Sequence, residues 1–279
     1  MKIDFHVHIT PPDIIKDWKK IAEKEDYFRL LSESPVNKFA TADDDVVREL
    51  ESSGIDKAVI FGFAFKDMGL CRYVNDYTAQ AIKKYPEKLI GYMVAMPTSR
   101  ELEKEIDRCR AAGLKGIGEL FPQGQGFDIA DSKEMSNLAN LCIERNLPLI
   151  IHTNEPVGHY YAGKTNTTPE KAGTFAQNFP DVKVIFAHWG GGLMFYELMP
   201  EIKKQNQNVY YDTAASPLLY NKNIYKTAGD IEVLHKVLFG SDFPLLPMKR
   251  YLKEISESGL SQEEQELVCG QNACRLLGL

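Results

Sequence analysis

Two histidines near the start of the chain, His6 and His8, are separated by one residue and belong to a short, largely apolar stretch. Side chains two residues apart on a strand point to the same face, so both imidazoles would project together. A pair of neutral imidazoles can bind a divalent cation, because nitrogen ligands suit zinc and its first-row neighbours. Two surface histidines near a terminus could have the same spacing, so the pair needs further ligands from the rest of the chain.

Four more residues of metal-binding or titratable type come at or just after the ends of other apolar runs. Such runs, bounded by turn residues, are typical of parallel strands that are buried on both faces. In a closed parallel barrel the carboxyl ends of the strands converge on one face, where the active sites of that fold lie. The residues expected to meet there are His6, His8, Glu119, His152, His188 and Asp242.

Apolar runs alternate with helical patterns along the chain, and this alternation predicts the fold. Strands are predicted over residues 1–8, 56–61, 89–95, 114–118, 148–151, 182–187, 208–211 and 237–240. Helices are predicted over residues 43–53, 72–85, 100–112, 132–145, 169–178, 193–204 and 225–235, with closing helices over 249–257 and 261–276. Eight such units indicate an α/β fold, a single (β/α)8 TIM barrel over residues 1–279, with a doubly wound open sheet as the alternative.

An insertion separates the first predicted strand from this alternation. About thirty residues follow His8 before the next unit begins, which is longer than the usual connection between elements. The insertion contains several aromatic residues, among them Trp18, Tyr27 and Phe28. A segment that directly follows a strand with candidate ligands would lie over the mouth of a site, as lids do. An ordinary helical excursion packed on the body of the protein is the alternative.

The composition is that of an ordinary globular protein, with 44% hydrophobic and 26% charged residues. The formal net charge is −6 and there is no basic stripe, so neither nucleic acid nor a membrane is expected as a partner. The five cysteines are scattered and lie mostly beside apolar residues, which is typical of core residues in a reducing compartment. Together with the lack of a signal-like apolar segment, these features predict a cytoplasmic location.

The chain resembles the amidohydrolase superfamily, and within it the branch of small barrels that includes amino-carboxymuconate-semialdehyde decarboxylase. The stretches that carry the resemblance are residues 4–8, 151–152, 186–191 and 239–244, and they occur in the family's order along the whole chain. The resemblance implies a metal held by His6, His8, His152 and Asp242, with His188 near the metal-bound water or the substrate. It also suggests a homodimer.

Glu119 departs from the pattern of the decarboxylases in this branch. The superfamily often has a carboxylated lysine or a glutamate after the fourth strand as a bridge between two metals, whereas its decarboxylases usually have neither. A second ion would favour hydrolysis, because a bridging hydroxide is a good nucleophile. The alternative is a carboxylate that hydrogen-bonds a ligand histidine. We expect Zn²⁺, as one ion or two, although such sites also accept manganese, iron, cobalt or nickel.

The residues therefore predict a metal-dependent hydrolase that uses a metal-activated water on a small amide, ester or lactone. Bound zinc lowers the pKa of its water to about 7. Asp242 would ligate the ion and accept the proton of the water, while His188 would stabilise the oxyanion or transfer a proton. The alternative is a metal-dependent, non-oxidative decarboxylase of an aromatic or unsaturated carboxylic acid. A barrel that keeps a metal only for stability is a third interpretation.

The loop after the fifth predicted strand would lean over the same mouth. His159, Tyr160 and Lys164 in this loop are expected to contact an anionic or polar group of a small-molecule substrate, with a solvated loop as the alternative. Asp212 ends the seventh predicted strand and would either cap the next helix or orient a ligand histidine. His235 precedes the last strand at the opposite end, so a structural role is expected for it.

Overall fold

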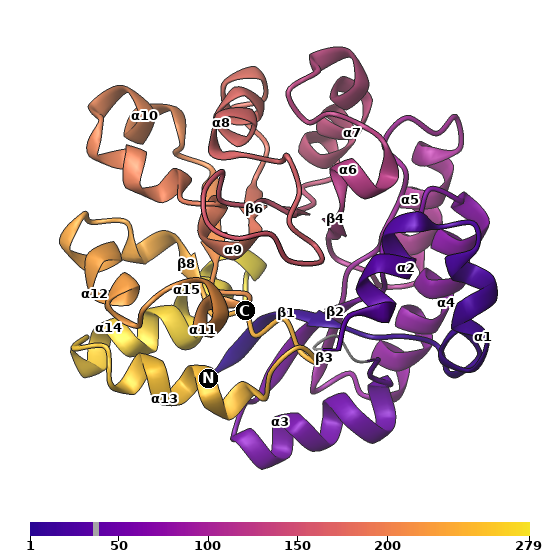
Figure 1. Ribbon diagram of the computed structural model, residues 1–279, viewed down its shortest axis with the longest axis horizontal. Coiled ribbons are helices and arrows are strands. Elements are labelled where there is room, and N and C mark those ends of the chain that lie inside the picture. Colours follow the sequence, from indigo (N-terminus) through magenta and orange to yellow (C-terminus); the bar gives the residue numbers. More distant parts are fainter. Residues whose placement is uncertain (36–38) are drawn as a thin grey trace.

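The computed structural model describes residues 1–35 and 39–279, in which a ring of helices surrounds eight short strands (Figure 1). Neighbouring strands pair in parallel, in the orders β1-β2-β3 and β4-β5-β6-β7-β8. The strands are β1 (Ile3–His8), β2 (Lys57–Phe61), β3 (Leu89–Gly91), β4 (Ile117–Leu120), β5 (Leu149–Ile151), β6 (Val184–Phe186), β7 (Val209–Asp212) and β8 (Val237–Leu238).

Backbone hydrogen bonds close the two gaps between these groups of strands. Between β3 and β4, the amide of Met93 donates to the carbonyl of Gly116 at 2.9 Å, and the amide of Gly118 donates to Met93 at 2.8 Å. Between β8 and β1, the amide of Phe5 donates to the carbonyl of Phe239 at 2.7 Å. The predicted (β/α)8 barrel is therefore confirmed, and the open-sheet alternative is wrong.

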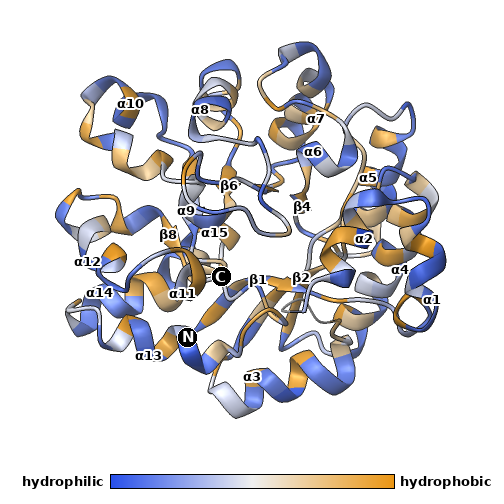
Figure 2. Ribbon diagram, viewed as in Figure 1, coloured by the Kyte–Doolittle hydropathy of each residue, from blue (hydrophilic) through white to orange (hydrophobic). Residues whose placement is uncertain are grey.

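A ring of helices forms the outer layer, and both hydrophobic and hydrophilic residues occur along these helices (Figure 2). The outer layer consists of α3 (Val47–Ser53), α4 (Met68–Lys84), α5 (Leu102–Ala111), α7 (Ser132–Glu144), α8 (Pro169–Asn178), α10 (Pro200–Gln205), α12 (Asn223–Asp230) and α13 (Met248–Ser256). The shorter elements are η1 (Ala42–Val46), α6 (Pro122–Gln125), α9 (Ala187–Gly190), η2 (Leu193–Leu198), α11 (Ser216–Leu219), η3 (Leu234–Lys236), α14 (Gln262–Glu266), η4 (Leu267–Gln271) and α15 (Asn272–Leu277).

Two of the predicted helices are shorter than the sequence pattern indicated. The helix expected over 193–204 is divided into η2 and α10, because Pro200 has no amide hydrogen and its ring is excluded from a helix interior. The helix expected over 225–235 ends at Asp230, and the separate turn η3 leads into β8. The strand expected over 89–95 is regular only as far as Gly91.

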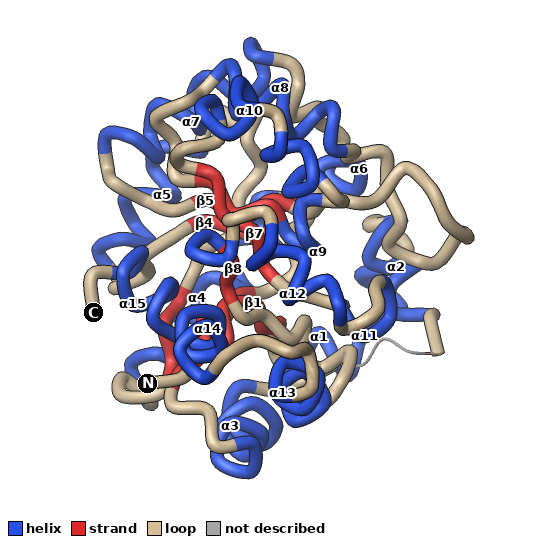
Figure 3. The backbone as a smooth tube through the Cα atoms, turned by 90° about the vertical axis from the view of Figure 1, so that its left-hand side faces the viewer, coloured by secondary structure: helices blue, strands red, loops and turns tan. Residues whose placement is uncertain are grey.

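The insertion after β1 forms two helices, α1 (Pro12–Ala22) and α2 (Asp26–Glu33), and its residues 36–38 lie outside the described residues. Phe28 of α2 is buried, with its ring 5.3 Å from the rings of both Phe63 and Phe65. Figure 3 shows α2, α6 and α11 at one end of the strands and both chain termini at the other. Among the described helices, none is both long and apolar enough for a membrane span.

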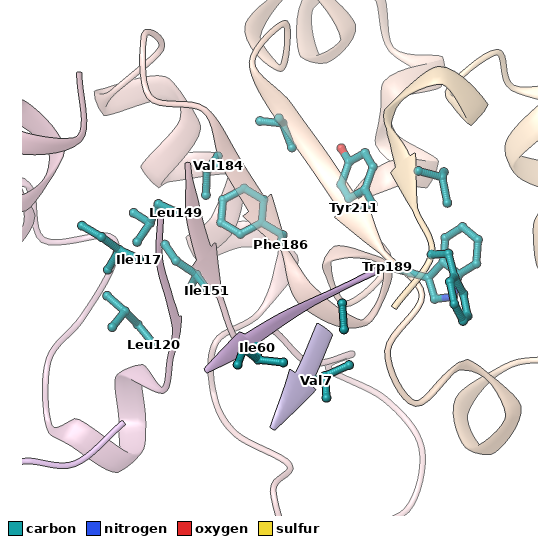
Figure 4. Packing of buried hydrophobic residues seen from close by; sticks show 14 of the residues in the cluster. Val7, Ile60, Ile117, Leu120, Leu149, Ile151, Val184, Phe186, Trp189 and Tyr211 are labelled. Carbon is teal, nitrogen blue, oxygen red and sulfur yellow. The ribbon is translucent and has the colours of Figure 1, made fainter. Parts of the chain in front are cut away.

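Alternate residues of the strands contribute to two different parts of the core, as the two-residue period of a strand requires. On β5, Leu149 and Ile151 belong to the cluster drawn in Figure 4, with Val184 and Phe186 of β6. Ile150, between them, belongs to a second buried cluster with residues such as Phe5, Tyr92 and Ile185. The barrel therefore has a packed core, and this core holds the strand ends in place.

A buried ion pair joins η2 to η3 and contacts β7. The ammonium of Lys236 lies 2.8 Å from a carboxylate oxygen of Glu197, whose other oxygen accepts a 2.7 Å hydrogen bond from the hydroxyl of Tyr211. Lys236→Met is expected to lower the free energy of unfolding by about 3–5 kcal/mol, because it leaves the charge of Glu197 buried without its partner. Urea denaturation measures this change.

An exposed ion pair of the same residue types provides the control. Lys203 and Glu232 are also 2.8 Å apart, but both side chains are exposed. Surface pairs of this kind contribute little to stability, so Lys203→Met should leave the unfolding midpoint nearly unchanged. Equal losses of stability in the two variants would contradict the role given to burial.

Candidate metal centre and active site

Four donor atoms converge at the carboxyl ends of β1, β4 and β8, and we call them the first donor set. The two imidazoles of β1 approach each other, with His6 Nε2 at 3.3 Å from His8 Nε2. Glu119 Oε2 lies 3.6 Å from His6 Nε2 and 3.5 Å from His8 Nε2. Asp242 Oδ1 lies 3.7 Å and 3.4 Å from the same two nitrogens. Residues from opposite ends of the chain thus face one point.

The spacing and chemistry of the first donor set fit a divalent cation. Ligand atoms about 2.1 Å from one tetrahedral ion lie about 3.4 Å from one another. The five separations given above, each of which involves a histidine nitrogen, range from 3.3 to 3.7 Å and agree with that value. Imidazole nitrogens and carboxylate oxygens are ligands that zinc, manganese and iron accept.

Glu119 also belongs to a second donor set, through its other oxygen. Its Oε1 atom lies 2.9 Å from His152 Nδ1 and 3.5 Å from His188 Nε2, and these two nitrogens are 3.1 Å apart. All three side chains of the second donor set are buried. Glu119 therefore presents one carboxylate oxygen to each set. A bridging ligand would be placed in this way, and so would a carboxylate that orients a histidine.

The charges in the cluster are those that a cation site requires. Burial raises the pKa of Glu119, but His6 and His152 outweigh it and hold this pKa well below its usual value. Burial lowers the pKa of His6, but Asp212 and Glu119 outweigh it and hold this pKa well above its usual value. The Glu119 carboxylate thus lies ionised in a buried position that attracts positive charge.

Asp212, at the end of β7, orients the ring of His6 and holds the backbone of His188. Its Oδ2 atom lies 2.8 Å from His6 Nδ1, which leaves His6 Nε2 for the first donor set. Its Oδ1 atom accepts 3.0 Å hydrogen bonds from the backbone amides of His188 and Ala214. Of the two interpretations of Asp212, orienting a ligand histidine is therefore the one that the structure supports.

Asp212→Asn is expected to weaken metal binding about 10- to 100-fold, because hydrogen bonds to ligand histidines contribute this much to affinity. Titration of the metal-free protein with Mn²⁺ would measure the change. Asp181→Asn is the control, since Asp181 is exposed and remote from the donor sets. Equal affinities in the two variants would show that Asp212 does not support the site.

The chain turns sharply after β6, where His188 and Trp189 have left-handed backbone angles (φ 56° and 61°). Such angles are costly for residues with a Cβ and occur mainly at functional sites, where neighbouring groups hold them. Gly191 completes the turn, and a Cβ there would lie 2.3 Å from the carbonyl oxygen of Asn154. The amide of Gly191 donates to the carbonyl of His188, so this glycine serves the tight turn.

A cavity of about 740 Å³ opens directly above the donor sets, and His8, Glu119, His152, His188 and Asp242 form part of its lining. Tyr27, Phe28 and Leu31 of the insertion also line it, so the insertion covers the site, as expected for a lid. The cavity wall is rich in aromatic rings. These belong to Tyr27, Phe28, Phe63, Phe121, Tyr161, Phe195, Tyr196 and Tyr220.

The three loop residues for which substrate contact was predicted differ in their position relative to the cavity. His159 lines the cavity. Tyr160 is 72% exposed and is not among the lining residues. Lys164 is also absent from the lining, and its ammonium donates to the backbone carbonyls of Val157 and His159. Contact of these three residues with a substrate stays a prediction.

Three polar residues of the same loop had not been singled out from the sequence. Asn154 lies next to the second donor set, with its Oδ1 atom 2.9 Å from His152 Nε2. Glu155 and Tyr161 follow it and line the cavity. Their position directly after a strand that ends in a candidate ligand is the signal that could have identified them.

Known proteins resemble this chain over its whole length. The family model described as Amidohydrolase matches residues 3–279. The 2-amino-3-carboxymuconate-6-semialdehyde decarboxylase of Dictyostelium discoideum is 24% identical, with 100% of this chain and 92% of that protein covered. The structure of 5-carboxyvanillate decarboxylase from Sphingomonas paucimobilis has a TM-score of 0.82 at 16% identity, with 100% and 99% of the chains covered.

A second solved structure adds a metal. The 5-carboxyvanillate decarboxylase of Novosphingobium aromaticivorans, complexed with manganese and 4-hydroxy-3-methoxy-5-nitrobenzoic acid, has a TM-score of 0.77 at 16% identity. The match covers 100% of this chain and 96% of that one. The ion in that relative is manganese, whereas zinc was the ion expected here.

The prediction of a hydrolase acting on an amide, ester or lactone is wrong in the light of these relatives, since all three are decarboxylases. Glu119 had favoured hydrolysis because a bridging carboxylate suits a pair of ions with a hydroxide between them. Ligand types, however, identify a cation site and leave the reaction open, because the same positive centre can stabilise different transition states.

Proposed function

Because this chain belongs to the amidohydrolase family, we propose that it is a metal-dependent, non-oxidative decarboxylase of an aromatic or unsaturated carboxylic acid. The named relatives, all decarboxylases, support the reaction type. The observation that carries the proposal is the placement of both donor sets at the base of a cavity whose wall is rich in aromatic rings. Such a cavity suits a flat small molecule with its carboxylate toward the cluster.

In this proposal the first donor set binds the ion through His6, His8, Glu119 and Asp242. The second donor set, in which His152 and His188 share the other oxygen of Glu119, offers a place for a second ion. A bound divalent cation supplies positive charge that orients the substrate and stabilises negative charge as it develops. Manganese and zinc both suit these ligands.

Decarboxylation breaks the bond between the carboxyl carbon and the carbon that bears it, so one proton must reach that second carbon. His188 is placed to transfer it. Its Nδ1 atom lies 3.0 Å from the carbonyl oxygen of Ala214, which directs Nε2 toward Glu119. Asp242 also lines the cavity and is the second candidate for holding this proton.

The wall of the cavity would hold the flat part of the substrate and keep water away from it. The ring of His8 stacks on Phe63, with centroids 5.0 Å apart and an angle of 15° between the planes. Phe121 packs against His152, with centroids 4.3 Å apart. These contacts fix the imidazoles next to the space where a substrate ring would lie.

Two sets of substrates, supplied to metal-loaded and to chelator-treated protein, test the proposal. One set contains aromatic and unsaturated carboxylic acids, assayed for carbon dioxide. The other contains esters, amides and lactones, assayed for hydrolysis. We expect carbon dioxide from at least one acid, only with metal present. Hydrolysis without any release of carbon dioxide would contradict the proposal.

A further inference from the structure

The cavity has an unusual distribution of charge for a protein that binds organic acids. Among the described residues that line it, none is Lys or Arg, the side chains that commonly pair with a carboxylate. Three carboxylates line it instead. Glu119 and Asp242 belong to the donor sets, but Glu155 lies outside them, on the loop after β5. The metal-facing part of the cavity and the Glu155 part therefore differ in what they can bind.

A chain of three hydrogen bonds fixes the position of Glu155 relative to the donor sets. Asn154 Oδ1 lies 2.9 Å from His152 Nε2, and the Asn154 amide nitrogen donates to the hydroxyl oxygen of Tyr161, also at 2.9 Å. The Tyr161 hydroxyl in turn donates to Glu155 Oε1 at 3.0 Å. Because Tyr161 accepts from Asn154, its one proton is directed to Glu155. The carboxylate is thus an oriented acceptor.

Glu155 retains capacity to accept further hydrogen bonds. A carboxylate has about four lone-pair positions, whereas the Tyr161 hydroxyl supplies one proton to it. Lys164 Nζ lies 3.7 Å from Glu155 Oε1, an ion-pair distance, but its hydrogen bonds go to the backbone carbonyls of Val157 and His159. The Glu155 side chain is 17% exposed, so it is only partly hydrated. A ligand group that can donate a hydrogen bond would therefore find an acceptor here.

From this arrangement we infer that Glu155, oriented by Tyr161, selects the substrate of the proposed decarboxylase by the substituent that lies away from the reacting carboxylate. The preferred substituent is a hydrogen-bond donor, a hydroxyl or an amino group. A second carboxylate at this place is rejected, because it would face the Glu155 carboxylate, and none of the described residues that line the cavity is a lysine or arginine that could pair with it. The inference rests on the proposed function, because that proposal directs the reacting carboxylate toward the donor sets and the rest of the substrate away from them.

Equilibrium binding of simple benzoates to the manganese-loaded protein tests this inference. The probes are benzoates with a hydroxyl, amino, methyl or second carboxylate group at the 3- or 4-position. We expect a hydroxyl or amino probe to bind at least about tenfold more tightly than its methyl counterpart, and the dicarboxylates to bind most weakly. Glu155→Gln, which keeps the shape of the side chain and removes its charge, should improve dicarboxylate binding at least about tenfold.

Tyr161→Phe is the matched control, because it removes the hydrogen bond that orients Glu155 and leaves the charge of Glu155 in place. This variant should still reject the dicarboxylates. Equal gains in dicarboxylate binding in both variants would assign the effect to loosening of the loop and overturn the inference. An unchanged order of affinities in Glu155→Gln, or no binding of any probe to the wild type, would also overturn it. Binding in the expected order, with no carbon dioxide from any acid, would refute the proposed function and leave the inference standing.

Discussion

Replacing His8 with alanine is expected to lower carbon dioxide release at least about a thousandfold, because a lost metal ligand removes several kcal/mol of transition-state stabilisation. His8 supplies one of the two nitrogens of the first donor set, and its Nε2 atom lies within 3.5 Å of both Glu119 Oε2 and Asp242 Oδ1. The same change should lower the manganese bound per chain. Activity assays and elemental analysis of one purified sample measure both effects.

The control for this prediction is His235→Ala, which makes the same chemical change at the opposite end of the barrel. His235 lies in η3, before β8, and is exposed. Its replacement should leave metal content and activity near the wild-type values. A His8→Ala protein that keeps its metal and its activity would exclude His8 as a ligand of the catalytic ion.

His188→Asn should lower kcat about 100- to 10,000-fold, the usual contribution of a residue that transfers a proton. Asparagine is the replacement of choice because it tolerates the left-handed backbone of residue 188 better than most residues. The first donor set does not include His188, so one bound ion per chain should remain. Steady-state kinetics and metal analysis separate these two effects.

Two outcomes would remove His188 from the proton-transfer role. One is a variant whose kcat stays within about tenfold of the wild-type value, since general acid–base catalysis contributes more than this. The other is a loss of activity that tracks a loss of all bound metal, which would make His188 a ligand of the essential ion. Gly173→Ala, in a helix of the outer layer where a Cβ finds its nearest neighbour at 3.8 Å, provides a mutated control with no expected effect.

The barrel could be predicted from the sequence because buried parallel strands leave a strong pattern. Runs such as 148–151 are apolar at every position, and turn residues bound them on both sides. The ends of the elements were harder to place. Pro200 divides a helix that apolar spacing alone presents as continuous, and β3 ends after Gly91 although apolar residues continue. Tertiary packing, which periodicity does not describe, decides these boundaries.

The central part of the candidate site followed from one geometric rule. His6, Glu119 and Asp242 are far apart in the chain, yet each comes at a strand's carboxyl end, and a barrel brings those ends together. Loops obey no such rule. Tyr160 was predicted to face the substrate, whereas its neighbour Tyr161 is the tyrosine that lines the cavity. A single residue's shift along an aperiodic loop changes which side chain lines the cavity.

The reaction could not be derived from the ligands. Histidine and carboxylate side chains identify a cation site, but the bond that is broken depends on the substrate that the cavity admits. Glu119, read as a sign of hydrolysis, is a buried carboxylate that contacts both donor sets. The decarboxylase relatives argue against hydrolysis. The aromatic wall of the cavity, assembled from distant segments such as Phe63 and Tyr220, was not visible in the sequence.

Titration of the metal-free protein with Mn²⁺, with bound metal and carbon dioxide release recorded in the same samples, tests the central claim most directly. Aromatic and unsaturated acids serve as the substrates. The account predicts no release without metal, and a release that rises in proportion to the manganese bound until the first donor set is filled. Equal release from metal-free protein, or fully loaded protein that releases no carbon dioxide from any acid, would contradict it.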